Sequence, residues 1–465
     1  MGRIPSLSNL SSKNGLFLWH WFIAVLIVGQ VFQHFAFQLI GGVTKDNPFS
    51  GPLIGLYGVA ASVILYRLFR SGGLLVYLSP RGVKILALSL LLGILLAIGL
   101  TYTPAPGYGL SKTVGYVAFN LGPSVFIFFL IRDEHDMLRL LKAILIVGIL
   151  STLVVILATL QLSGSFRSMG GVWDTKGYFY VLGTKVDLGI WFGRRMALLT
   201  VTALALTRLF QRKKYQWIAR FLVVAFGYLL ILAGARGPFY FGMMVLAITA
   251  YFLAESKILK RVFVFCSVGI AVFIIGKNIF YNPLVSTLSY LPVPVEIRER
   301  YGVPLEDPAG SWVIRSDFYK SAVDVFMENI IHGVGTGGWA YTRYGFDVRD
   351  YPHNIFLEIA SELGLLGLVV FCMFLGLLCR AAIVALKRRG RSPSLYLLGV
   401  WGLGVTLIGF FNAQTSGDIQ LNEYIWVGGA ILAKVATWSE MYKKHRSAGP
   451  MYTYRWFEFP VEGKP

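Results

Sequence analysis

The sequence predicts an all-α polytopic membrane protein with about twelve transmembrane helices. Hydrophobic residues make up 56% of the 465 residues and charged residues only 14%, and the mean hydropathy is +0.64. A soluble chain of this length carries more charge. Segments of about 20 apolar residues, the length of helix that crosses a hydrocarbon core of roughly 30 Å, recur along nearly the whole chain. The predicted spans are 16–37, 51–69, 82–101, 113–131, 138–162, 186–207, 215–234, 237–254, 262–280, 357–384, 394–412 and 422–440.

The first of these segments is predicted to be a retained span and not a signal peptide. Arg3 and Lys13 precede it, but the apolar run is long and no small-residue cleavage site follows. The three cysteines add no metal or disulfide pattern, because Cys266, Cys372 and Cys379 all fall inside predicted spans.

The basic residues predict the orientation of the spans. Lys and Arg collect in every second connection, in "YRLFRSGG", "RLFQRKKYQWIAR", "ESKILKR", "LKRRGR" and "KKHR". Because short inner loops carry an excess of Lys and Arg, we expect both termini to be cytoplasmic. The net charge of +20 then reflects topology and attraction to anionic lipid headgroups. Nucleic acid is a poor candidate partner, since the basic clusters are scattered over separate loops.

One connection is far longer than the others. Residues 281–352 separate the ninth and tenth spans, whereas ordinary connections are a few residues long. Prolines in its first part preclude a long regular helix there. The chain therefore divides into spans one to nine (1–280), this outer loop (281–352), spans ten to twelve (353–441) and a cytoplasmic tail (442–465).

The second part of the long outer loop is predicted to form an amphipathic helix. In "SWVIRSDFYKSAVDVFMENIIHGVG" apolar residues recur every four positions, while charged residues fall elsewhere around the helix. These apolar residues are Ile314, Phe318, Ala322 and Phe326. Such a helix would lie on the membrane or cap the bundle, and a loop of this length is a natural roof for a substrate cavity.

The distribution of acidic residues disfavours an ion-coupled carrier. Such carriers need ionisable groups, usually carboxylates, within the membrane. Here only Asp187, Glu358 and Glu362 fall at or near a span, each close to its outer end. The two halves of the chain also lack the internal repeat that many carriers show.

The outer ends of the spans are instead rich in arginine. Arg194 and Arg195 occupy the first turns of the sixth span in "WFGRRMALL", and Arg236 occupies the tight turn in "GARGPFYF". Arg315 lies on the predicted amphipathic helix. A guanidinium near the hydrocarbon boundary needs a partner, and its planar fork suits phosphate or pyrophosphate oxygens. Snorkelling to lipid phosphates is the simpler alternative.

A histidine motif closes the long outer loop. In "YPHNIFLEIASELGLLG" (351–367), His353-Asn354 is followed after nine residues by Gly364-x-x-Gly367. Three more segments accompany it, namely "AGARGP" (233–238), "ENIIHGVGTGGW" (328–339) and "SGDIQLNEYIWVGGAIL" (416–432). In this order, and with the long outer loop, they resemble the O-antigen ligase and polymerase superfamily of bacterial envelope glycosyltransferases. The resemblance extends over about residues 186–440.

This resemblance implies an inverting glycosyltransferase with a GT-C-like fold, independent of metal and of any cofactor. It would move a glycan from an undecaprenyl pyrophosphate carrier to an acceptor on the periplasmic face of the bacterial inner membrane. Charge that develops on a pyrophosphate leaving group must be neutralised by a divalent ion or by fixed cations. No Asp-x-Asp pair occurs in the chain, so the arginines are the available cations.

The resemblance and the chemistry together assign roles to a histidine and to the arginines. His353 is the predicted base, or orients the acceptor, because an imidazole with a pKa of about 6.5 can take a proton at neutral pH. Arg236 and Arg315 are predicted to hold the pyrophosphate, with Arg195 as a third cation. Arg194 projects roughly 100° away from Arg195 around a helix. We therefore expect only one of the two to face the cavity, and prefer Arg195.

Additional contacts are predicted around this centre. Asn354 is grouped with the substrate-binding residues. Glu362 either orients a basic residue or is simply an acid near the positive end of the helix dipole. Asp418 either touches the acceptor sugar or is a solvated loop group. Gly364 and Gly367 are predicted to allow close helix packing, and "GVGTGG" is predicted to be a turn because it lacks the Lys-Ser/Thr of a phosphate-binding loop.

The sequence leaves two glycosyltransferase activities open, which differ in the acceptor of the glycan. An O-antigen ligase joins the glycan to lipid A-core, whereas a polymerase joins it to another carrier-linked repeat. The histidine motif and the single dominant outer loop favour the ligase, since polymerases often carry a second large outer loop and segment 163–185 is short. Transfer of the glycan to protein is a further possibility. A transporter of lipid-linked oligosaccharide is the non-enzyme alternative, but it gives the histidine at the roof no role.

Overall fold

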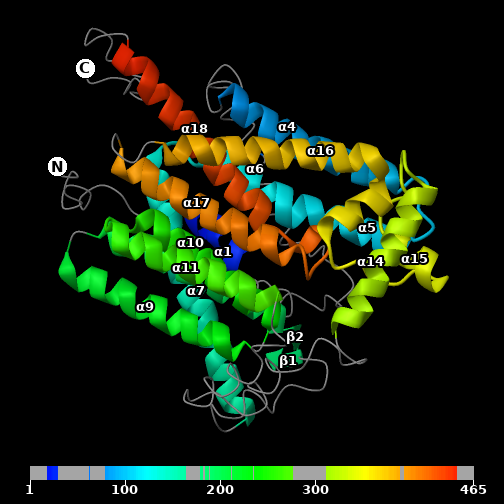
Figure 1. Cartoon of the computed structure of the whole chain (residues 1–465), viewed down its shortest axis with the longest axis horizontal. Helices are drawn as coiled ribbons and strands as arrows, with labels where there is room; N and C mark the ends of the chain where they lie inside the picture. The colour runs from blue at the N-terminus through cyan, green and yellow to red at the C-terminus, as the bar shows by residue number, and fades with distance from the viewer. Residues whose placement is uncertain are drawn as a thin grey trace.

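The computed structural model in Figure 1 is a helical bundle with a small hairpin at its side. It describes residues 18–29, 62, 79–163, 178–181, 184–187, 189–210, 212–233, 235–275, 311–387 and 392–447. Within these ranges the strands are β1 (Tyr178–Val181) and β2 (Thr184–Asp187), which pair antiparallel. The prediction of an all-α bundle therefore needs one addition, a two-stranded hairpin in the connection before the sixth predicted span.

The described helices coincide with most of the predicted spans. Eight are long and apolar enough to cross a membrane, and each overlaps one predicted span. They are α4 (Pro80–Gly99), the run α5 to α6 (Pro106–Leu130), α7 (Glu134–Ser163), α8 (Gly189–Leu209), α9 (Lys213–Leu232), α10 (Arg236–Leu253), α16 (Ile355–Leu386) and α17 (Pro393–Asn412). Three of the other predicted spans correspond to α1 (Leu18–Val28), α11 (Lys257–Ile275) and α18 (Tyr424–Ser447). The fourth, 51–69, lies outside the described residues except for residue 62. The structure thus supports eight of the twelve predicted spans.

The fourth predicted span begins earlier than expected and contains a π-helical turn. Its parts are α5 (Pro106–Gly115), the π turn η3 (Tyr116–Leu121) and α6 (Gly122–Leu130). Pro106 lies at the start of the helix. Pro123 lacks the N–H that an α-helical hydrogen bond would need, and the backbone hydrogen bonds change from the α to the π pattern just before it. Within the π turn, Asn120 Nδ2 donates to Ile419 O at 2.6 Å. The early start places Lys112 inside the bundle.

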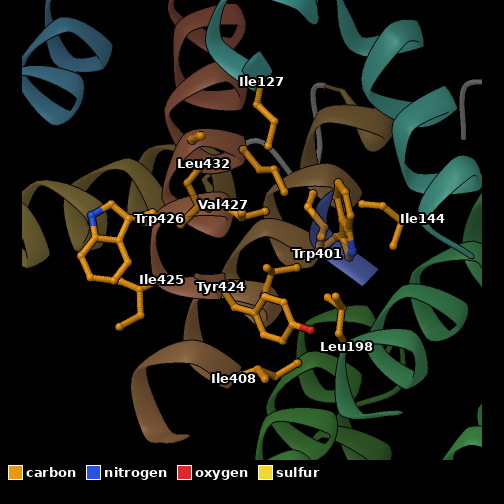
Figure 2. Packing of buried hydrophobic residues seen from close by; sticks show 14 of the residues in the cluster. Ile127, Ile144, Leu198, Trp401, Ile408, Tyr424, Ile425, Trp426, Val427 and Leu432 are labelled. Atoms are coloured by element: carbon orange, nitrogen blue, oxygen red, sulfur yellow. The ribbon is translucent and has the colours of Figure 1, made fainter. Parts of the chain in front are cut away.

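The core joins helices from both halves of the sequence. Figure 2 shows side chains of α6, α7, α8, α17 and α18 meeting around Trp401 and Tyr424. Trp401 is fully buried, and its indole N–H donates to Thr202 Oγ1 of α8 at 3.1 Å. Aromatic anchors of this kind combine a large apolar area with one directed polar contact. This contact fixes α17 against α8, the helix that carries Arg194 and Arg195.

Helix α16 is broken at Gly364, and a loop fills the break. Gly364 has φ 65° and ψ −162° inside the helix, a region of backbone space that only glycine adopts readily. Leu365 N donates to Ile330 O at 2.7 Å, while Val334 N donates to Ser361 O at 3.0 Å. The prediction that Gly364 serves helix packing is therefore wrong, because the residue allows the break into which segment 330–335 inserts.

Replacing Gly364 by alanine is expected to destabilise the protein by about 1–3 kcal/mol. A Cβ at this position would lie 2.4 Å from Ile331 O, and the backbone conformation is one that alanine avoids. Gly376 on the same helix is the matched control, because a Cβ there meets nothing within 4 Å. Thermal unfolding in detergent should show a lower Tm for Gly364→Ala and an unchanged or higher Tm for Gly376→Ala. Equal Tm values for the two variants would contradict the assigned break.

Two further helices cap one end of the bundle. The helices α14 (Ser311–Glu328) and α15 (Gly338–Tyr344) lie at the end opposite the last residues of α18 (Figure 1). Phe318, Ala322 and Val325 of α14 are buried against Trp339 of α15. Ile314, predicted on the same apolar face, is 48% exposed. A strict four-residue spacing drifts by about 40° per step around a helix of 3.6 residues per turn, so the buried face passes to Val325 and leaves Ile314 outside.

Candidate active site

His353 stands immediately before α16, in a backbone conformation that few side chains adopt. Its φ is 59°, which makes it the one non-glycine residue with positive φ among the described residues. Its ring stacks on Phe318 of α14, with centroids 5.8 Å apart and planes 10° apart, and lies 4.4 Å from the ring of Tyr351. Nδ1 is buried without a hydrogen-bond partner in the described part of the chain. A strained residue held by aromatic rings at a helix terminus is typical of a functional position.

The surroundings of His353 keep its imidazole neutral. Burial and the nearby Arg315 guanidinium lower the pKa of His353 from its ordinary 6.5 to about 4. The carboxylates of Asp350 and Asp418 act in the opposite direction and only partly offset these effects. At neutral pH the ring is therefore uncharged and has a nitrogen lone pair with which to accept a proton.

Arg315 brings a positive charge near this histidine, and Arg236 brings a second one near Arg315. Arg315 lies in the first turns of α14, half-buried, and Arg236 is the first residue of α10. Burial lowers the pKa of Arg315, and repulsion by Arg236 adds to the effect, while the phenols of Tyr319 and Tyr351 oppose it. Within the described residues Arg315 forms no ion pair. Two guanidinium groups that repel one another suit an anion of more than one charge.

Arg194 and Arg195 are both buried on α8. We expected only one of them to face the cavity; both side chains are buried, with exposed fractions of 3% and 7%. Helix α8 as a whole packs against α9, α10 and α17. Arg194 Nη1 donates to Leu421 O at 2.7 Å and Nη2 donates to Ser416 O. Arg195 interacts with Tyr424 at the start of α18.

The connection between α17 and α18, residues 413–423, is the segment on which these groups converge. Arg194 holds two of its carbonyls, and Gly417 N donates to the Tyr351 hydroxyl at 3.1 Å. Tyr319 of α14 donates its hydroxyl to Gln414 O at 3.2 Å. The connection therefore links α8, α14 and the residues next to His353. We call residues 413–423 the hub loop.

Asp418 of the hub loop is a buried group and not a solvated one. Its exposed fraction is 0%. Oδ2 accepts hydrogen bonds from the Tyr108 hydroxyl at 2.8 Å and from Gln420 Nε2 at 2.7 Å. Oδ1 is buried without a hydrogen-bond partner in the described ranges. One carboxylate oxygen thus joins Asp418 to α5 and to the hub loop itself.

Asn354 caps the helix that follows the histidine. Its side-chain oxygen accepts from Phe356 N at 3.0 Å and Leu357 N at 3.2 Å, the pattern of an N-cap residue. Its amide nitrogen donates to Gln414 Oε1 at 3.2 Å. Both ends of the amide are therefore bound within the protein, and Asn354 fixes the start of α16 beside the hub loop.

Of the two interpretations of Glu362, the structure supports the one in which it meets a basic residue. Lys112 Nζ lies 2.6 Å from Glu362 Oε1 and 2.9 Å from Glu358 Oε1, and all three side chains are buried. Sequence reasoning assigned no role to Lys112 or Glu358. The only signal in the chain was a lysine directly before the predicted span 113–131, and its two partners lie more than 200 positions away.

Taken together, the apolar helices and the polar, arginine-rich cap define a multi-pass membrane protein with a buried site at one end of its bundle. Residues 221–372 match the family model described as O-antigen ligase, and this stretch contains Arg236, Arg315 and His353. The match confirms the resemblance to the O-antigen ligase and polymerase superfamily and indicates a membrane glycosyltransferase of that general type. No curated protein matches the chain.

Proposed function

We propose that the protein is an O-antigen ligase of the bacterial inner membrane. It would transfer a glycan from undecaprenyl pyrophosphate to lipid A-core, with inversion and without a metal ion, at the periplasmic end of a GT-C-like bundle. The observation that carries this proposal is a neutral, half-buried histidine held beside Arg315 at the capped end of the bundle.

The reaction makes two demands, and the site has a group for each. The acceptor hydroxyl must lose a proton as its oxygen attacks the sugar, and the neutral ring of His353 takes that proton. The pyrophosphate leaves with growing negative charge, which Arg236 and Arg315 neutralise through fixed N–H groups. Arg194 and Arg195 act indirectly in this scheme, because their buried side chains hold the hub loop and the start of α18.

An acceptor assay tests the proposal against the polymerase. The purified protein in detergent is given a lipid-linked glycan with either lipid A-core or no added acceptor, and the products are separated on a gel. The ligase predicts glycan on lipid A-core and no reaction without it. Lengthening of carrier-linked chains would identify a polymerase instead. Movement of the lipid-linked donor across vesicle membranes without any transfer would favour a transporter.

The pH dependence of transfer should report His353. Because protonation removes the base, and the pKa of the free protein's imidazole is about 4, kcat/KM should stay level at neutral pH and fall only well below pH 6.5. A bound pyrophosphate adds negative charge next to the ring and raises its pKa, so kcat should begin to fall at a higher pH than kcat/KM. Initial rates at several donor concentrations across the pH range check both limbs. An acid limb of kcat/KM near pH 6.5 would contradict the described environment of His353.

A further inference from the structure

A buried ionic cluster joins α5 to the first part of α16, outside the groups that meet the substrates. It consists of Lys112, Glu358 and Glu362, whose side chains are at most 2% exposed. The two carboxylates are four residues apart, so they lie on one face of α16, and both lie before the break at Gly364. Lys112 also sits 4.6 Å above the ring of Tyr108. We call these three residues the lysine triad.

The lysine triad also binds two loops of the site. Glu362 Oε2 accepts a hydrogen bond from Gly337 N at 2.9 Å, in the loop that leads into α15. Glu358 Oε1 accepts one from Ile419 N at 3.0 Å, in the hub loop. The triad is therefore the point where α5, α16, the hub loop and the cap of the bundle are tied together.

Because α16 is broken at Gly364, the contacts of the lysine triad matter for the position of His353. Residues 355–363 are separated from the rest of the helix by Gly364, so the main body of α16 does not by itself fix their direction. Their polar contacts include the inserted segment 330–335, the cap by Asn354, the bond from Ile355 N to Ala413 O and the lysine triad. Ile355, Ile359 and Leu363 also pack in the hydrophobic core. His353 directly precedes this short segment, so a shift of the segment would move the backbone that carries the ring.

Burying one ammonium with two carboxylates is a poor way to gain stability. Desolvation of buried ions offsets their mutual attraction, and well-packed neutral groups of similar size often serve a fold as well. A buried ionic cluster that adds little stability can still hold the segments that carry its charges in one relative position. This argues that the triad serves the placement of the site more than the free energy of folding.

We propose that Lys112 is a positioning residue for glycan transfer, which holds residues 355–363 through Glu358 and Glu362 and so sets His353 relative to Arg315 and Arg236. The proposal rests on the proposed function for its catalytic consequence. Lys112 itself touches neither substrate. Its effect is on the rate of the chemical step, and the binding of the donor depends on the arginines.

A neutral version of the triad tests this proposal. In the full-length protein, Lys112→Met, Glu358→Gln and Glu362→Gln are combined, so that each glutamine keeps an oxygen for Gly337 N or Ile419 N while the ionic tie is removed. We expect kcat to fall at least tenfold, with KM for the lipid-linked donor and the Tm close to wild type. Lys112→Arg with the native glutamates should retain most of the rate. Lys434→Met is the matched control, because Lys434 is equally buried but belongs to α18 and donates to Phe128 O.

Hydrogen exchange supplies a readout that does not depend on transfer. In the neutral triad, amides of residues 355–363 should exchange faster, while those of 365–386 should not. Wild-type kcat and wild-type exchange in this variant would overturn the proposal, as would an equal loss of kcat in Lys434→Met. If the triple variant does not fold, Glu358→Gln alone is measured in the same way, and an unchanged rate and exchange would again overturn it. An inert wild-type protein would refute the proposed function, whereas the exchange comparison would still decide whether the tie exists.

Discussion

Replacing His353 by asparagine is expected to lower kcat for glycan transfer by roughly 100- to 10,000-fold, the usual contribution of a general base. Asparagine tolerates the positive φ of this position better than most residues, so the fold should survive. Its amide cannot take a proton at neutral pH, so the acceptor hydroxyl must then react without a base. The rate of transfer to lipid A-core and the Tm of the same preparation are the two measurements.

A second histidine at the same end of the bundle provides the control. The Nδ1 atom of His332 lies 2.7 Å from Gly333 O, and its ring packs on Tyr102, so it has a structural explanation within the chain. His332→Gln should therefore keep nearly the wild-type rate once its folding is verified. A fully active His353→Asn protein would remove His353 from the mechanism.

Removing either pyrophosphate-binding arginine is the second change with a large expected effect. Arg315→Gln and Arg236→Gln should each lower kcat by roughly 100- to 1,000-fold, because each removes fixed donors from the leaving group. Lysine at either position should restore part of the rate, since it keeps the charge but not the planar fork. The double variant should lose less than the product of the two single losses, because the two charges repel one another in the free protein.

An arginine far from the site separates this effect from a general loss of charge. Arg208 is paired with Glu255 at 2.9 Å, where α8 and α10 end, and both side chains are exposed. Arg208→Gln should leave kcat and the donor KM unchanged. Full activity in Arg315→Gln, or an equal loss in Arg208→Gln, would refute the role given to the arginines.

The sequence carried enough information to locate most of the helices and to group the residues of the candidate site. Apolar runs of membrane length located the spans, because a helix in lipid must be apolar over its whole crossing. The histidine motif and the arginine turns identified His353, Arg236 and Arg315 as a group, and the structure places Arg315 close enough to each of the other two for electrostatic interaction.

Features that depend on contacts between distant segments were not predictable. The pairing of Lys112 with Glu362 joins residues 250 positions apart, and no local pattern specifies such a contact. The break at Gly364 exists because segment 330–335 enters the helix. The spacing of Gly364 and Gly367 alone predicted close helix packing. The hydrogen bonds of Asn354 and Arg194 to the hub loop were not predictable for the same reason.

The central claim is that fixed arginines and a neutral histidine suffice for transfer from a pyrophosphate carrier. The most direct measurement is the initial rate of glycan transfer to lipid A-core by the purified protein in excess EDTA, compared with the rate in Mg²⁺. The account predicts equal rates, with one undecaprenyl pyrophosphate released for each glycan transferred. A strict requirement for Mg²⁺, or release of the carrier lipid without glycosylated lipid A-core, would contradict it.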